Sequence, residues 1–193
     1  MEKSLPKGAG RSSVGLVDTR RILRELKLKK GMNLLDMACG KGEYSLAASK
    51  LVGNNGLVYA IDLWEEGIAD LLKQVSDRKI KNIDAKVADL REKIPLKDSC
   101  VDLCLMATVL HDLVETNGAG QALKEAARVL RPEGMLAVIE FKKMEGPPGP
   151  PMNIRLTPEE VSRLTAPYGF TRRRIIDVGP YNYMMLFTVQ KVG

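Results

Sequence analysis

Short apolar runs alternate with amphipathic stretches along almost the whole chain. The apolar runs predict seven strands, at residues 32–37, 57–62, 83–87, 101–107, 135–141, 175–178 and 183–190. The run at 101–107 has almost no polar alternation, which is typical of a central parallel strand buried on both faces.

Between these runs, apolar residues recur at helical spacing. They predict helices at residues 18–28, 43–51, 65–77, 120–130 and 158–168. The last of these should begin with a capping box, because Thr157 is followed by Pro158 at the first helical position and by Glu160. In the helix at 65–77, four side chains should face inward, namely Ile68, Leu71, Leu72 and Val75.

The alternation of strand and helix predicts an α/β fold, a doubly wound and mainly parallel seven-stranded sheet with helices on both faces. The 193 residues suit a single domain spanning 1–193. We expect three parts: an N-terminal helical segment at 1–30, a central core at 31–141, and a C-terminal part at 142–193 that completes the sheet and its edge loops.

Composition places the chain among globular proteins, with 45% hydrophobic and 28% charged residues. No apolar run approaches the roughly 20 residues of a membrane helix, and residues 1–13 lack the apolar region of a secretory signal. Three cysteines without Cys-x-x-Cys spacing argue against a disulfide framework or a zinc site. We therefore expect a cytoplasmic protein that carries no metal.

The net charge of +6 is concentrated in two basic clusters. They contain Arg20, Arg21, Arg24, Lys27, Lys29 and Lys30, and then Arg172, Arg173 and Arg174. An anionic partner such as RNA is one interpretation. The other interpretation is that the clusters form a solvated helix face and an exposed strand end. We favour this second interpretation because only 5% of residues are aromatic and no stacking platform is visible. Oligomeric state stays open.

The chemistry-bearing pattern begins at the end of the first strand. Gly40 and Gly42 stand at alternate positions between an apolar run and a helical pattern, so the backbone can approach a ligand at the helix N-terminus. Asp62 follows at the tip of the next strand, where an acid suits the two hydroxyls of a ribose. Together these residues predict a nucleoside-containing cofactor.

Three nucleotide classes make different demands on this loop. A phosphate-binding P-loop requires Ser or Thr after Gly-Lys, but Gly42 follows Lys41. A dinucleotide site prefers a third glycine where this chain has Ser45. Asp36, expected in the first loop, would repel a pyrophosphate but suits an ammonium group. S-adenosylmethionine carries an ammonium, a sulfonium, a ribose and an adenine and no phosphate, so it fits best.

At this point the chain resembles the class I S-adenosylmethionine-dependent methyltransferases. The resemblance rests on four ordered segments, at 35–42, 60–62, 88–89 and 128–134, and covers residues 30–141 most strongly. The chain is most similar to small single-domain members related to the ubiquinone and menaquinone C-methyltransferases. The resemblance implies a Rossmann-like fold whose final strand runs antiparallel beside the fifth, and methyl transfer to a small-molecule acceptor.

The resemblance also adds residues to the expected cofactor site. Leu63 and Trp64 should border the adenine. Asp89 should accept a hydrogen bond from the adenine amino group, and Leu90 should offer a backbone N–H. The interpretation of Asp89 as a turn cap stays open. The expected set of cofactor-binding residues is Asp36, Ala38, Gly40, Gly42, Asp62, Leu63, Trp64, Asp89, Leu90 and Thr108.

His111 is the only histidine of the chain and follows the fourth strand, where the first and fourth strands should diverge. A neutral imidazole there could take a proton from the acceptor as general base, or could only position the loop. The segment 146–151, Gly-Pro-Pro-Gly-Pro-Pro, should form a stiff polyproline-like loop at the same edge, either lining the acceptor pocket or only connecting.

Two alternatives to a small-molecule methyltransferase stay open at this stage. One is an RNA-directed methyltransferase or RNA-binding module that uses the basic N-terminal helix. The other is a metalloid methyltransferase using the thiols of Cys39, Cys100 and Cys104, although cysteine in an apolar strand usually behaves as a small hydrophobe.

Overall fold

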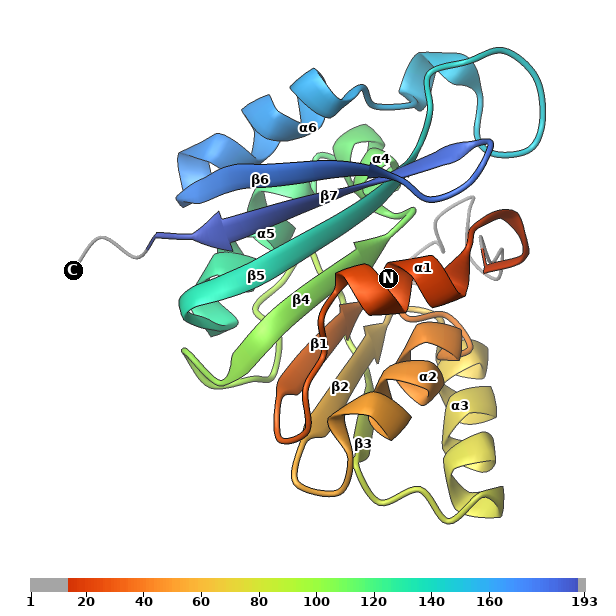
Figure 1. Cartoon of the computed structure of the whole chain (residues 1–193), viewed down its shortest axis with the longest axis vertical. Helices are drawn as coiled ribbons and strands as arrows, with labels where there is room; N and C mark the ends of the chain where they lie inside the picture. The colour runs from red at the N-terminus through yellow and green to blue at the C-terminus, as the bar shows by residue number, and fades with distance from the viewer. Residues whose placement is uncertain (1–13, 191–193) are drawn as a thin grey trace.

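The computed structural model describes residues 14–190, so the expectations for residues 1–13 lie outside the described part of the chain. Its sheet has seven strands in the order β3-β2-β1-β4-β5-β7-β6 (Figure 1). The strands are β1 Asn33–Met37, β2 Leu57–Asp62, β3 Ile83–Val87, β4 Val101–Ala107, β5 Leu130–Phe141, β6 Phe170–Asp177 and β7 Asn182–Val189. Strands β1 to β5 are parallel and β7 runs antiparallel between β5 and β6. The predicted fold class and the antiparallel last strand are confirmed.

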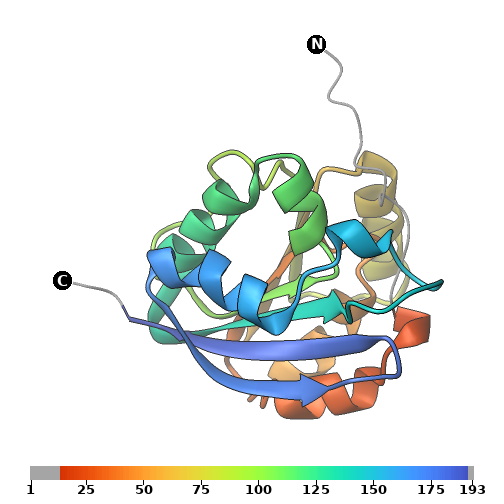
Figure 2. The same ribbon diagram turned by 90° about the horizontal axis from the view of Figure 1, so that it is seen from above.

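Helices cover both faces of the sheet. They are α1 Thr19–Glu25, α2 Glu43–Val52, α3 Glu65–Asp77, α4 Leu110–Glu115, α5 Ala119–Val129 and α6 Pro158–Thr165, with short 3-10 turns at Val14–Leu16, Met152–Ile154 and Ala166–Tyr168. Seen along the sheet, α1 and α2 lie on one side and α4, α5 and α6 on the other (Figure 2). Helix α3 packs beside α2 through Leu71, which contacts Leu46 and Ala60.

Strand β4 explains how one apolar run serves two cores. Cys104 and Met106 belong to the cluster under α4, α5 and α6, whereas Leu103 and Leu105 belong to the cluster under α1 and α2. Successive side chains of a strand point to opposite faces, so both faces of β4 require apolar residues. The expectation of a doubly buried central strand is confirmed.

Several expected boundaries are wrong for local reasons. The segment 110–115 forms helix α4, which the sequence did not predict because it is one short helix whose N-cap, Val109, makes no side-chain cap. Leu72 was expected inward but is 46% exposed on α3. Strand β6 begins at Phe170 rather than 175, so the basic cluster Arg172–Arg174 lies within an edge strand.

Other expectations hold in detail. The Thr157 hydroxyl accepts the Glu160 N–H at 3.2 Å, and the Thr157 N–H donates to the Glu160 carboxylate at 2.7 Å, which confirms the capping box. The helix at 158–168 ends its α-helical part at Thr165 and continues as a 3-10 turn. Within residues 14–190, no helix combines the length and the apolar character needed to cross a membrane.

Candidate active site

The loop between β1 and α2 adopts left-handed backbone conformations. Ala38, Gly40 and Gly42 have φ values of 63°, 55° and 76°. A Cβ on Gly42 would lie 2.4 Å from a methyl of Leu71, so packing against α3 requires glycine there. A Cβ on Gly40 would meet nothing within 4 Å. The loop therefore presents an open surface at Gly40, as the close approach of a ligand requires.

Asp36 lies beneath this loop rather than in it, which corrects the expectation. It belongs to β1 and is 1% exposed. The Ser45 hydroxyl donates to its Oδ2 at 2.6 Å, and Oδ1 has no hydrogen-bond partner among the described residues. Burial raises the pKa of this carboxyl to about 7; the Ser45 hydrogen bond opposes the rise and the nearby Asp62 charge adds to it. Asp36 is therefore not a fixed negative charge at neutral pH.

Asp62 joins the tip of β2 to the glycine loop. Its Oδ2 accepts the Gly40 N–H at 2.7 Å, and its Oδ1 accepts the Trp64 N–H at 2.8 Å. Each carboxylate oxygen can accept more than one hydrogen bond, so the side chain keeps acceptor capacity for ribose hydroxyls. Trp64 caps α3, and the Lys41 ammonium lies 5.6 Å from its ring centroid.

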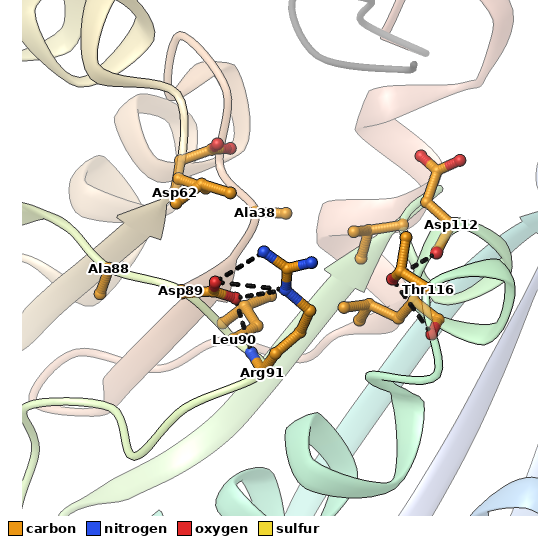
Figure 3. Close-up of a pocket in the computed structure, with 11 residues that line it drawn as sticks. Ala38, Asp62, Ala88, Asp89, Leu90, Arg91, Asp112 and Thr116 are labelled. Atoms are coloured by element: carbon orange, nitrogen blue, oxygen red, sulfur yellow. Dashed lines mark hydrogen bonds and ion pairs between the residues drawn. The ribbon is translucent and has the colours of Figure 1, made fainter. Parts of the chain in front are cut away.

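Asp89 makes the contacts of a turn cap, which is the alternative role that the sequence analysis left open. Its Oδ1 accepts the Arg91 backbone N–H at 2.9 Å, and its Oδ2 accepts the Arg91 guanidinium at 2.8 Å (Figure 3). The carboxylate is thus held beside a cation at the mouth of the site. An adenine amino group there would share the carboxylate with Arg91, and its binding stays a prediction.

One open pocket brings half of the expected cofactor-binding residues together. Its lining includes Ala38, Asp62, Leu63, Asp89 and Leu90 from the expected set. Asp36, Gly40, Gly42, Trp64, Thr108 and His111 are not among the lining residues. The sequence did not assign the other lining residues to a site: Ala88, Arg91, Val109, Asp112, Leu113 and Thr116.

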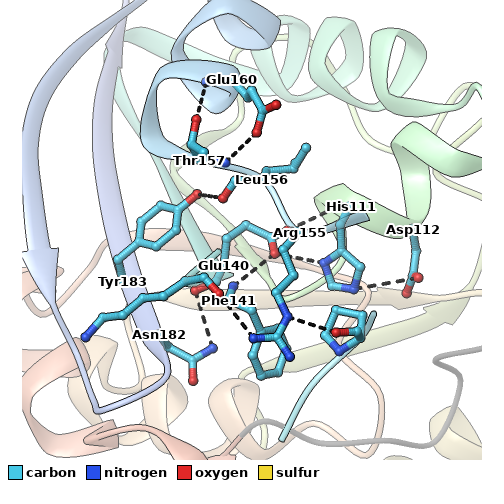
Figure 4. A network of polar contacts seen from close by, with 12 residues as sticks. His111, Asp112, Glu140, Phe141, Arg155, Leu156, Thr157, Glu160, Asn182 and Tyr183 are labelled. Carbon is cyan, nitrogen blue, oxygen red and sulfur yellow. Dashed lines mark hydrogen bonds and ion pairs between the residues drawn. The ribbon is translucent and has the colours of Figure 1, made fainter. Parts of the chain in front are cut away.

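His111 lies at the start of α4, against a residue that the sequence analysis missed. Its Nδ1 is 2.8 Å from Oε2 of Glu140, and its backbone N–H donates to Oε1 at 3.1 Å (Figure 4). Glu140 is completely buried in β5. The signal that could have found it is an acid inside the otherwise apolar run at 135–141. Thr108, which follows the neighbouring strand β4 and has φ 54°, donates its N–H to the Ile139 carbonyl at 2.8 Å.

The loop at 142–155 is built around Arg155, which is only 2% exposed. Its guanidinium donates to five backbone carbonyls, those of Lys142, Met144, Gly146, Pro148 and Pro150. It also lies 5.7 Å from the centroid of the Phe141 ring, which in turn contacts His111 edge to face. The segment 146–151 therefore wraps around a cation instead of running as a stiff extended connector. It is not among the segments that line the pocket.

The three cysteines do not form a thiolate site. Burial raises the pKa of each thiol, and Cys104 is completely buried. In residues 14–190 no group of three or more His, Cys, Asp or Glu side chains is placed to hold a metal ion. Thiolate capture of a metalloid has no support in this arrangement.

Comparisons with known proteins give a family match and similar sequences. A family model described as a methyltransferase domain matches residues 28–169. Demethylmenaquinone methyltransferase of Staphylococcus aureus (strain MRSA252) is 31% identical over 121 residues, covering 63% of this chain and 48% of that protein. The Lactobacillus johnsonii protein of the same name is 29% identical over 129 residues, with coverages of 66% and 51%. The chain thus spans about half the length of the curated relatives it matches.

A solved structure extends the similarity over the whole fold. The crystal structure of a SAM dependent methyltransferase from Aquifex aeolicus is 34% identical, with a TM-score of 0.84. The match covers 97% of this chain and 100% of that one. Unlike the curated relatives, this protein has no large part without a counterpart here.

Proposed function

The chain belongs to the class I S-adenosylmethionine-dependent methyltransferase family, and from this we propose that it transfers a methyl group from S-adenosylmethionine to a small-molecule acceptor. One observation carries the proposal. Ala38, Asp62 and Leu90 come from three separate segments of the chain, and they line one pocket beside the open Gly40 loop. The pocket combines hydrogen-bond acceptors for a ribose with apolar walls for a base.

The residues present fit this cofactor better than a phosphate-bearing one. Two carboxylates, those of Asp62 and Asp89, line the pocket, whereas Asp36 under the loop adds no fixed charge because burial raises its pKa to about 7. A pyrophosphate would meet repulsion there, whereas a group with ammonium and sulfonium charges is attracted. S-adenosylmethionine supplies an electrophilic methyl group that the sulfonium has already activated.

The chain's own residues then have three tasks: to bind, to align and to exclude water. Asp62 orders the glycine loop through the Gly40 N–H and is placed for the ribose. Val109 and Leu113 give the acceptor side of the pocket an apolar wall. The Arg155 loop follows β5 at the same edge of the sheet, and its guanidinium packs against the Phe141 ring.

The similarity to demethylmenaquinone methyltransferases suggests a reduced naphthoquinone ring as the first acceptor to test. The RNA-directed alternative rests on the basic cluster at residues 20–30, whose arginines and lysines are exposed, and it stays a prediction. The second basic cluster has partners within the protein. The cluster Arg172–Arg174 lies on the edge strand β6, where Arg174 pairs with Glu25 at 2.9 Å and Arg173 donates to Thr188 at 2.8 Å. Charged side chains on an edge strand protect it from pairing with other chains.

Isothermal titration calorimetry with S-adenosylhomocysteine tests the proposal. The protein should bind this demethylated cofactor at micromolar concentration and should not bind NADH. Release of labelled S-adenosylhomocysteine from labelled cofactor with a short-chain demethylmenaquinol then tests turnover. Binding of NADH in preference to S-adenosylhomocysteine would overturn the proposal.

A further inference from the structure

Glu140 fixes both the charge and the orientation of its neighbours. Its carboxylate accepts two backbone N–H groups, that of His111 at 3.1 Å and that of Phe141 at 3.2 Å, and its Oε2 lies 2.8 Å from His111 Nδ1. An ionised carboxylate only accepts hydrogen bonds, so the ring nitrogen that faces it must be the donor. The proton of a neutral His111 ring therefore resides on Nδ1, which leaves Nε2 as the acceptor.

Nε2 of His111 faces a second carboxylate. It lies 3.7 Å from Oδ1 of Asp112, longer than a direct hydrogen bond but close enough for strong electrostatic coupling. An unprotonated Nε2 would turn its lone pair toward the Asp112 charge. His111 and Asp112 therefore tend to hold one proton between them and titrate as a pair.

Exposure increases along this row of three groups. The side chains of Glu140, His111 and Asp112 are 0%, 5% and 18% exposed. Only Asp112 is among the residues that line the pocket. The imidazole that the sequence singled out is thus one step behind the surface that an acceptor meets, and Asp112 is the outermost member.

The charges around His111 and Asp112 increase the proton affinity of both groups. Burial lowers the pKa of the imidazole, but the charge and hydrogen bond of Glu140, with Asp112 and Glu115, outweigh it and raise the pKa. Burial, Glu140 and Glu115 also raise the pKa of Asp112, and His111 opposes this rise. The two groups are consequently stronger bases than an isolated histidine and aspartate.

We propose that Asp112 takes the proton of the acceptor during methyl transfer, with His111 and Glu140 as positioning residues behind it. This rests on the methyltransferase function proposed above. The acceptor's electron pair forms the new bond to the methyl carbon, and the carbon–sulfur bond breaks with its electron pair on sulfur. The acceptor's proton passes to the Asp112 carboxylate, from which His111 Nε2 can receive it.

The proposal restricts the class of acceptor. A base is useful only if the methylated atom, or a group conjugated with it, loses a proton during the reaction. Phenols, quinols and acidic carbons satisfy this condition, whereas a tertiary amine or a thioether does not. The acceptor should therefore carry a dissociable O–H or C–H at or beside the reacting atom.

The single histidine makes the coupling directly measurable, because imidazole NMR of the full chain reports His111 alone. In the wild type, the neutral ring should carry its proton on Nδ1. Asp112→Asn should lower the pKa of His111 by at least about half a unit, since a charge that favours the imidazolium is lost. Asp77→Asn, at the exposed end of α3, is the control and should leave it unchanged. An unchanged pKa in Asp112→Asn would overturn the coupling.

Turnover tests the role of Asp112 itself. With a short-chain demethylmenaquinol as probe, Asp112→Asn should lower kcat about 100-fold or more, while its affinity for S-adenosylhomocysteine stays within about 3-fold. The wild-type kcat should rise with pH to a plateau above the measured pKa of His111, and this dependence should disappear in Asp112→Asn. A wild-type kcat in this variant would contradict the proposal and leave the methyltransferase function intact. Failure of the wild type to bind S-adenosylhomocysteine would instead refute the function beneath it.

Discussion

The two halves of the sheet hold their polar groups in different ways. On the side of β1, β2 and β3, carboxylates are held by nearby backbone N–H groups, as Asp62 is by Gly40 and Trp64. On the side of β4, β5 and β7, buried charges are held entirely by other groups of the protein, as His111 is by the Glu140 carboxylate and Arg155 by the carbonyls of its own loop. The first half is a ligand site whose carboxylates keep spare acceptor capacity, and the second is a set of buried charges with internal partners.

Because of this difference, we expect the two halves of the sheet to contribute differently to folding stability and to ligand binding. Carboxylates that keep spare acceptor capacity can meet a ligand without losing their own contacts. Buried charges whose partners all lie within the protein have no such freedom, and removing one leaves its partners unsatisfied. Mutations in the cofactor half, around β1, β2 and β3, should therefore act mainly on affinity. Mutations of the buried charges with internal partners in the acceptor half, around β4, β5 and β7, should act mainly on stability.

The largest effect is expected from Asp36, which breaks the simple rule because it lies buried in the cofactor half. Its pKa of about 7, against 3.8 for an exposed carboxyl, means that the folded state binds its proton more tightly than the unfolded state. Stability from this group is complete below about pH 4 and is lost as pH rises toward 7, by about 4 kcal/mol at most. Relative to Asp36→Asn, the wild type should lose stability over this range in denaturant titrations. A constant difference would show that Asp36 is not buried as a neutral acid.

Arg155→Ala should lower the free energy of unfolding by about 3 kcal/mol, since five carbonyls lose the buried guanidinium that donates to them. Urea unfolding measures the change. Arg163→Ala, an exposed arginine on α6, should change it by less than about 0.5 kcal/mol. S-adenosylhomocysteine affinity should stay close to that of the wild type in both variants. A stable Arg155→Ala protein with lost affinity would reverse the assignment of the two halves.

Gly42→Ala and Gly40→Ala sharpen the comparison within one loop. Both positions have positive φ, so each alanine should cost about 1 kcal/mol. At Gly42 the new methyl also collides with Leu71, and the total should reach about 2–3 kcal/mol in thermal or urea unfolding. At Gly40 the methyl enters open space, so calorimetry should show weakened cofactor binding with little further loss of stability. Equal effects of the two substitutions on stability and on affinity would contradict this division.

Asp62→Ala should weaken S-adenosylhomocysteine binding about 30-fold, or about 2 kcal/mol, because hydrogen bonds to a charged acceptor are lost. The variant should still fold, since the hydrogen-bond partners of Asp62, Gly40 and Trp64, are backbone N–H groups in a partly exposed loop. Asp77→Asn supplies the control on a distant exposed acid. Unchanged affinity in Asp62→Ala would remove the ribose contact from the site.

The sequence predicted the cofactor half far better than the acceptor half. Gly40, Gly42 and Asp62 belong to short segments whose spacing follows from a strand, a tight turn and a helix, so local pattern suffices. The sequence analysis missed the burial of Asp36, because the pattern of apolar residues does not show which residue near the end of a strand will lie under the following loop. Glu140 gains its role from His111, which only the tertiary fold brings near, and α4 is too short to carry a helical signal.

A crystal structure of the protein with S-adenosylhomocysteine tests the central claim most directly. The ribose hydroxyls should lie at Asp62, the amino-acid end should pass over Gly40, and the sulfur should face the pocket wall formed by Val109 and Asp112. A ligand bound elsewhere on the molecule, or a dinucleotide whose phosphates rest on the glycine loop above Asp36, would contradict it.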